Sequence, residues 1–179
     1  LLARVRWLAD AMPELALPAF DEAMLRAMLP DLCQGLCSLE DLRKRDWLPS
    51  LQVSIGFDRL PEVDRLAPES LEVPSGNRHR LQYEAGRPPV LAVRIQEVFG
   101  LPATPRIAGG RVPVLLHLLG PNHRPQQVTD DLASFWATTY SEVKKELRRR
   151  YPKHAWPDDP LSAEASRSGL SGNRKRSGG

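Results

Sequence analysis

Apolar positions recur with a helical period through the first third of the chain. Leu2, Val5, Leu8 and Met12 follow one another at steps of three and four, which predicts a helix over residues 2–12. The same period predicts further short helices over residues 20–29, 38–48 and 61–67. Residues 50–57 fit a strand as well as a helix. We therefore expect a cluster of short helices in residues 1–69.

Local signals refine the ends of two of these helices. Asp21 favours a helix N-terminus, and Pro30 is expected to end the helix that begins there. Ser38 stands three residues before Asp41, which is the spacing of a capping box.

The pattern changes at Leu71, where short extended runs replace the helical period. The stretches "LEVPSGNRHRLQY" and "RVPVLLHLL" predict strands, and "PPVLAVRIQEVFG" predicts a strand that enters a short helix and stops at Gly100. The "PSGN" sequence provides a turn. Gly109 and Gly110 favour a tight turn with positive φ angles.

The longest periodic segment is predicted over residues 129–151. Its apolar stripe consists of Leu132, Trp136, Tyr140, Val143, Leu147 and Tyr151. Thr129 is expected to cap this helix and Pro152 to end it. After it, residues 161–179 are rich in Ser and Gly, have no apolar period, and are expected to be disordered.

These patterns predict an α+β fold. It has a helical N-terminal third, a small antiparallel β-sheet or partial barrel, and one long C-terminal helix. We expect a helical region over residues 1–69, a second domain over residues 70–160, and a basic tail over residues 161–179.

Charge is distributed unevenly along a chain whose formal net charge is only +3. Residues 1–70 hold 8 Lys and Arg against 12 Asp and Glu, whereas residues 141–179 hold 10 against 5. An acidic beginning and a basic end indicate an anionic partner for the second half. No apolar run is long enough to span a membrane.

Catalytic and metal-binding patterns are not found in the sequence. Cys33 and Cys37 are expected to be free buried thiols, typical of a reducing compartment. The four histidines do not have ligand spacing, and His117 is expected to be a core residue. No glycine-rich loop is followed by Lys-Ser or Lys-Thr, which a phosphate-binding loop needs to hold the outer phosphates and magnesium.

A basic cluster at the end of the predicted long helix is the one candidate binding surface. It consists of Lys144, Lys145, Arg148, Arg149 and Lys153, with Arg78, Arg111 and Arg124 as second-rank candidates. One interpretation is a phosphate-contacting surface for nucleic acid. The other is structural, because cations near a helix C-terminus are stabilised by the helix dipole at ~0.3–1 kcal/mol each without any ligand. On that interpretation the neighbouring Asp158 and Asp159 are either solvated or docked against the basic helix end.

Several stretches resemble one known family. "PRIAGGRVPVLLHLLGPNHRPQQVTDDLASFW" and "YSEVKKELRRRYPKHAWPDDP" are similar to the C-terminal domain of bacterial HrpB-type ATP-dependent helicases, which are DEAH-box members of superfamily 2. The resemblance covers residues 70–160, and residues 1–69 resemble the helical region just before that domain.

The resemblance implies a non-motor portion of a cytoplasmic RNA helicase. The implied partners are the motor domains of the same polypeptide and RNA or another single-stranded nucleic acid. ATP and Mg²⁺ are implied for those motor domains, and no cofactor is expected in this chain. None of the motor motifs is present, so no catalytic residue carries over and the chain alone is expected to be inactive. The alternative is a structural or regulatory docking module that does not contact nucleic acid.

Overall fold

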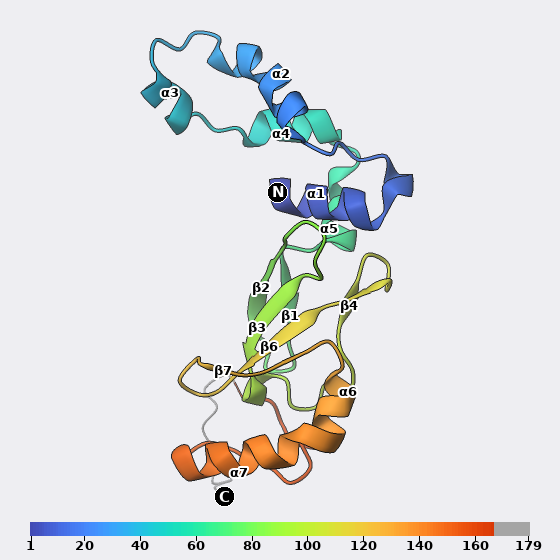
Figure 1. Cartoon of the computed structure of the whole chain (residues 1–179), viewed down its shortest axis with the longest axis vertical. Coiled ribbons are helices and arrows are strands. Elements are labelled where there is room, and N and C mark those ends of the chain that lie inside the picture. Colours follow the sequence, from blue (N-terminus) through green and yellow to red (C-terminus); the bar gives the residue numbers. More distant parts are fainter. Residues whose placement is uncertain (167–179) are drawn as a thin grey trace, which may run out of the picture. The chain divides into compact units, whose positions relative to one another are not determined.

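The computed structural model describes residues 1–166 of the chain (Figure 1). Contacts divide it into two compact units. Unit 1 contains residues 1–69, 83–88 and 107–112, and unit 2 contains residues 70–82, 89–106 and 113 onward. The predicted division into residues 1–69, 70–160 and 161–179 stays a prediction.

Short helices make up most of unit 1. They are α1 (Leu2–Ala11), η1 (Pro13–Leu15), α2 (Glu22–Cys33), α3 (Leu39–Lys44), α4 (Leu48–Ile55) and α5 (Leu60–Leu66). Asp21 caps α2 through the backbone N–H of Met24, and Ser38 caps α3 through that of Asp41, as expected. Pro30 does not end α2, which continues to Cys33. The residues that fitted both strand and helix form α4.

The core of unit 1 lies around α1 and α5. Val5 and Leu8 of α1 are fully buried, and Arg4 donates to the carbonyl of Ala67 and to Asp64 near the end of α5. Cys33 and Cys37 are exposed free thiols, so the expectation of buried cysteines is wrong. The reason is that α2 buries only Leu32.

Unit 2 is built on a five-stranded sheet with the order β1-β2-β3-β6-β7. The strands are β1 (Ser70–Glu72), β2 (Arg78–Gln82), β3 (Val90–Arg94), β6 (Leu115–Leu119) and β7 (Pro125–Thr129). A separate two-stranded ribbon pairs β4 (Arg106–Ile107) with β5 (Val112–Pro113). Gly109 and Gly110 turn between them with φ of 66° and 87°, as predicted.

The sheet is mixed. β3 and β6 pair in parallel, whereas the other pairs in the sheet are antiparallel. A parallel pair needs a crossover of a dozen or more residues, and residues 95–114 provide it with the helix η2 (Ile95–Glu97) and the β4–β5 ribbon. Leu91, Val93, Leu116 and Leu118 form the buried side of this central pair. His117 faces the other side and is half-buried, so it is not a core residue.

The long C-terminal helix has three parts. It consists of α6 (Leu132–Ser134), a π-helical turn η3 (Phe135–Thr139) and α7 (Tyr140–Arg150). Asp131 caps it through the backbone N–H of Ser134, so the assignment of Thr129 as the cap is wrong. Thr129 is unable to serve because its backbone belongs to β7, where it pairs with Leu116.

An aromatic cluster joins this helix to the rest of unit 2. Phe99, Phe135, Trp136 and Tyr140 contact one another, with ring centroids 5.0–6.2 Å apart. The indole N–H of Trp136 donates to the carbonyl of Leu101.

The α+β class, the helical N-terminal third and the long C-terminal helix are confirmed. Of the predicted disordered tail, residues 167–179 lie outside the described residues. Residues 161–166 are described, and the N–H of Ser166 donates to the carbonyl of Gln96. Within residues 1–166, no helix is long and apolar enough to cross a membrane.

Candidate nucleic-acid interface

The helix α7 presents the predicted basic cluster. Tyr140 and Leu147 are its buried residues, and they fix which side of the helix faces the core. Three arginines form its last turn, and Pro152 follows directly after the C-cap Tyr151. Cations are favoured there by the helix dipole.

The segment after α7 folds back along the helix. The hydroxyl of Tyr140 donates to the carbonyl of Pro157, and the indole N–H of Trp156 donates to the carbonyl of Tyr151. Burial raises the pKa of the Tyr140 hydroxyl above its ordinary value, and the charge of Asp158 raises it further. These contacts bring Asp158 against α7.

Lys144 is occupied by this segment. Its ammonium group lies 2.6 Å from the Asp158 carboxylate and 5.8 Å from the centre of the Tyr140 ring. Only 15% of the Lys144 side chain is exposed, so Lys144 is not open to solvent as a phosphate-contacting residue would be. The hydrogen bond and charge of Lys144 lower the pKa of Asp158, and the charge of Arg148 adds a smaller contribution in the same direction. Asp158 thus meets both expectations, because its side chain is 98% exposed to solvent and its carboxylate also pairs with a cation of α7.

The other cations of the cluster divide into paired and unpaired groups. Lys145 forms an ion pair with Glu142 at 2.7 Å, and the neighbouring Arg150 pairs with Glu146 at 3.1 Å. Arg148 and Arg149 are exposed and form no ion pair within residues 1–166. Lys153 lies beyond the helix and is exposed.

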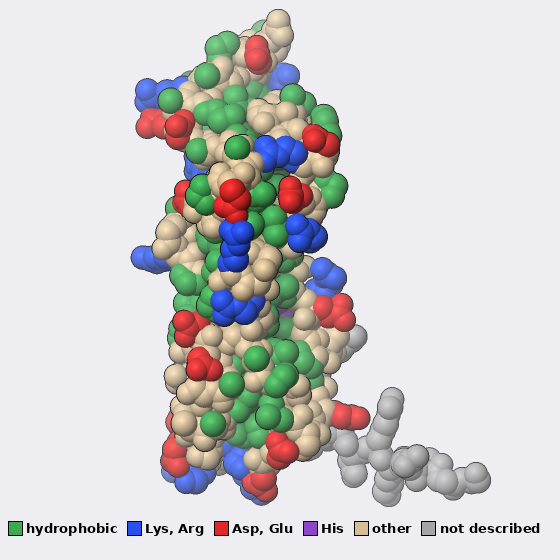
Figure 2. All heavy atoms as spheres, turned by 90° about the vertical axis from the view of Figure 1, so that its right-hand side faces the viewer, with side chains coloured by type: hydrophobic (Ala, Val, Ile, Leu, Met, Phe, Trp, Pro, Cys, Tyr) green, Lys and Arg blue, Asp and Glu red, His purple; other side chains and the backbone are tan. Residues whose placement is uncertain are grey.

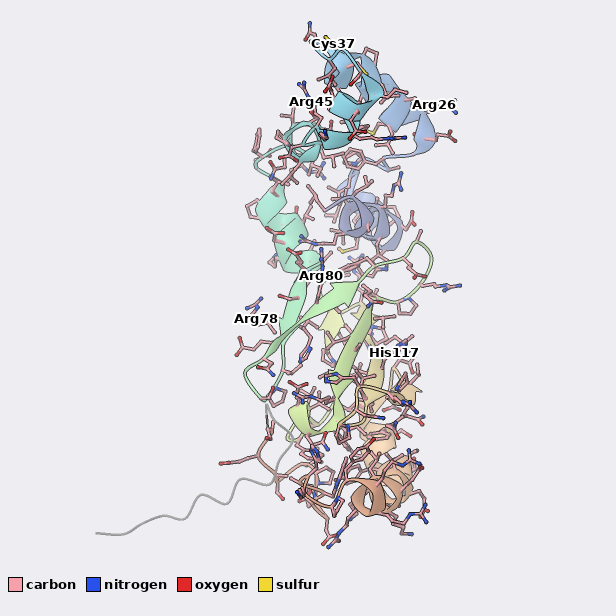
Figure 3. All side chains as sticks on the ribbon, turned by 90° about the vertical axis from the view of Figure 1, so that its left-hand side faces the viewer. Arg26, Cys37, Arg45, Arg78, Arg80 and His117 are labelled. Atoms are coloured by element: carbon pink, nitrogen blue, oxygen red, sulfur yellow. The ribbon has the colours of Figure 1, made fainter. Side chains whose placement is uncertain are left out.

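The second-rank arginines do not join this cluster. Arg78 lies on β2, where it donates to Ser70 and lies 3.9 Å from Glu72 (Figure 3). Arg111 belongs to unit 1 and pairs with Glu14. Arg124 lies in the exposed turn before β7, and its guanidinium makes no ion pair in the part of the chain that the structure describes.

Charges of both signs are interspersed on one face of the molecule. On the face shown in Figure 2, Lys and Arg side chains stand beside Asp and Glu side chains rather than in one basic area. A strand-tracking surface requires neutralising cations along the path of the phosphates. Of the predicted residues, Arg148 and Arg149 provide the one exposed unpaired group on a single element.

A buried polar cluster in unit 2 was missed by sequence reasoning. Glu97 is 1% exposed and accepts hydrogen bonds from Asn77, His79 and Arg94, the last two at 3.2 Å. Burial raises the pKa of Glu97, but the hydrogen bonds from Asn77 and Arg94 and the charges of His79 and Arg94 outweigh it, so the pKa lies below its ordinary value. A carboxylate inside the apolar run "RIQEVFG" was the available signal.

The Gly109–Gly110 turn does not have the geometry of a phosphate-binding loop. A phosphate-binding glycine turn leads from a strand into a helix, whose N-terminus holds the phosphates. Here the Gly109–Gly110 turn leads from β4 into β5 instead. No group of three or more His, Cys, Asp and Glu in this part of the chain has the geometry to hold a metal ion.

The comparison with known protein families identifies the class to which the chain belongs. The family model described as "ATP-dependent helicase C-terminal" matches residues 28–160. The chain therefore belongs to the HrpB_C family of ATP-dependent helicase C-terminal domains. This confirms the resemblance found in the sequence.

One curated relative is the ATP-dependent RNA helicase HrpB of Escherichia coli K12. It is 41% identical over an alignment of 172 residues, and the match covers 93% of this chain and 21% of the relative. The crystal structure of the E. coli DExH-box NTPase HrpB matches 93% of this chain and 22% of its own, with a TM-score of 0.84 and 40% identity. The crystal structure of the E. coli DEAH/RHA helicase HrpB matches 87% of this chain and 20% of its own, with a TM-score of 0.69 and 40% identity. The chain thus spans about a fifth of the length of these relatives.

Proposed function

We propose that this chain acts as the non-motor C-terminal part of an ATP-dependent RNA helicase and docks on the motor-containing remainder of the polypeptide. The length comparison supports this proposal, because matched relatives carry about four-fifths of their length outside the matched region. ATP and Mg²⁺ then belong to that remainder, and the cytoplasmic location stays a prediction.

The exposed apolar side chains are the observation that carries the docking proposal. Within residues 1–166, six large hydrophobic side chains are exposed: Leu39, Leu48, Val53, Phe57, Val128 and Leu161. Four of the six lie in residues 39–57 of unit 1, and a concentration of exposed apolar side chains in one segment favours a site of protein contact there. The predicted basic cluster, by contrast, is partly neutralised by the carboxylates of the same chain.

Nucleic-acid contact is the second candidate function. Arg148 and Arg149 favour it, because both are exposed at the end of α7 without an ion pair in the described chain. Arg124 is a further exposed candidate. Lys144, held by Asp158, is not expected to contribute. Contacts of this kind would go to phosphates and would provide no sequence choice.

Hydrogen exchange tests both candidates. Backbone amide exchange is compared between the 179-residue chain alone and the complete helicase polypeptide, with and without single-stranded RNA. Docking predicts that surface amides of this chain exchange at least about tenfold more slowly in the complete polypeptide without RNA. Equal exchange in the two samples would contradict docking. Slower exchange at the end of α7 that appears only with RNA would support the second candidate.

A further inference from the structure

The helical arm, residues 22–58, has too few buried side chains for its length. It contains α2, α3 and α4, and its buried hydrophobic side chains are Leu32, Leu51 and Ile55. Short helices are stabilised mainly by packing of an apolar face rather than by their own propensity. A segment with so small a core is stabilised further when a partner covers its surface.

Exposed apolar side chains are concentrated on the same arm. Leu39, Leu48, Val53 and Phe57 are 75%, 44%, 65% and 62% exposed. On α4, Leu51 and Ile55 face inward, and Val53 lies on the opposite side because two residues correspond to about 200° around a helix. The apolar surface of α4 is therefore directed outward as well as toward the core.

Val53 lines a groove between α4 and α2. The groove has a volume of about 290 Å³, and its apolar lining includes Met28, Leu32 and Pro49. Asp31 stands in the same lining, and its carboxylate makes no hydrogen bond or ion pair within residues 1–166. The groove thus combines an apolar floor with one unpaired anion.

We infer that this groove binds a segment of the motor-containing remainder of the same polypeptide, through an apolar side chain with a Lys or Arg beside it. The inference rests on the proposed docking function and names the surface that performs it. The apolar side chain would fill the groove against Val53, and the neighbouring cation would pair with Asp31. The family model begins at Met28, so the groove-forming residues lie inside the matched region.

Two valine substitutions provide a matched test. Val53 is 65% exposed in the groove, and Val128 is 48% exposed on β7 in unit 2. In the 179-residue chain alone, V53E and V128E are both expected to leave the melting temperature unchanged, because both side chains already face solvent. In the complete polypeptide, V53E should reduce the exchange protection of α2 and α4 amides by at least about tenfold, whereas V128E should not.

A charge substitution tests the predicted neighbouring cation. In the complete polypeptide, D31K should weaken the protection of α2 and α4, whereas D58K, which changes an exposed carboxylate outside the groove lining, should not. Equal effects of D31K and D58K would overturn the assignment of a Lys or Arg to the partner segment.

The outcomes distinguish the groove from docking in general. One outcome would overturn the groove inference and leave the docking function intact. In it, other surfaces of the chain are protected from exchange, α2 and α4 are not, and V53E and V128E have the same effect on exchange protection. Absence of protection anywhere on the chain would overturn both. Protection of α2 and α4 that appears in the isolated chain as its concentration rises would show that a second copy occupies the groove, which overturns the inferred partner.

Discussion

At the scale of single residues, local electrostatics decides which charged groups remain available. Lys144 and Arg148 are four residues apart on α7, yet Lys144 is held by Asp158 and Arg148 forms no ion pair in the described chain. The difference comes from the returning segment, which reaches Lys144 because Trp156 and Tyr140 anchor it. A binding role is therefore assigned to individual residues and not to the basic cluster as a whole.

Glu97 supports a prediction at the same scale. Replacing it by Gln removes the carboxylate that Arg94 and His79 share, and the side chains of these two residues are only 18% and 25% exposed. We expect E97Q to lower the free energy of unfolding by about 2–3 kcal/mol at pH 7. This loss is smaller than the loss expected when one partner of a fully buried ion pair is removed. Urea denaturation followed by circular dichroism measures this difference.

The pH dependence provides the control. Because the folded pKa of Glu97 lies below the ordinary value of 4.5, its contribution is fully present above pH 4.5 and is lost as the pH falls through the folded pKa. The stability difference between wild type and E97Q should therefore shrink in acid. A difference that stays constant between pH 7 and pH 3 would show that the Glu97 charge contributes nothing.

At the scale of elements, the helix α7 depends on the few side chains that it buries. We expect L147A to destabilise unit 2 by about 2–5 kcal/mol, because Leu147 is fully buried and its removal leaves a cavity. L161A removes the same atoms from a side chain that is 46% exposed and should change the free energy of unfolding by less than about 0.5 kcal/mol. Thermal melting of the two variants compares them. Equal melting temperatures would mean that α7 is not packed as described.

Most elements of the fold follow from sequence periodicity. The helices α1, α3 and α5 and the strands β2, β3 and β6 were expected from local patterns, because their apolar residues recur at the period of the element. The π-helical turn at Phe135–Thr139 was not expected, since the apolar stripe at steps of three and four is also the pattern of an uninterrupted α-helix. The parallel pairing of β3 with β6 was also missed, because register between distant strands depends on the path of residues 95–114.

The candidate site was less predictable than the fold. The sequence places cations on α7, but whether each cation forms an ion pair depends on carboxylates that lie far from it along the chain. Asp158 is fourteen positions from Lys144, and Glu14 is ninety-seven from Arg111. Likewise, a carboxylate within the run "RIQEVFG" does not reveal that Asn77 and His79 will surround it.

At the scale of the whole molecule, the chain belongs to a family of helicase C-terminal domains, and we interpret its exposed apolar side chains as a docking surface. In residues 1–166 no group of three or more His, Cys, Asp and Glu could hold a metal ion, Lys144 is paired with Asp158, and four of the six exposed large hydrophobic side chains lie on the helical arm. The matched relatives are about five times as long. A domain of this kind is expected to work through contacts with the rest of the polypeptide.

Calorimetric titration tests this central claim most directly. The 179-residue chain is titrated, at several temperatures, into the helicase remainder produced without it. We predict a one-to-one complex with a negative heat-capacity change, which is the mark of apolar burial, and an affinity that persists in high salt. Two folded components that give no binding at any temperature, or a complex whose heat-capacity change is near zero and whose affinity disappears in salt, would contradict the account.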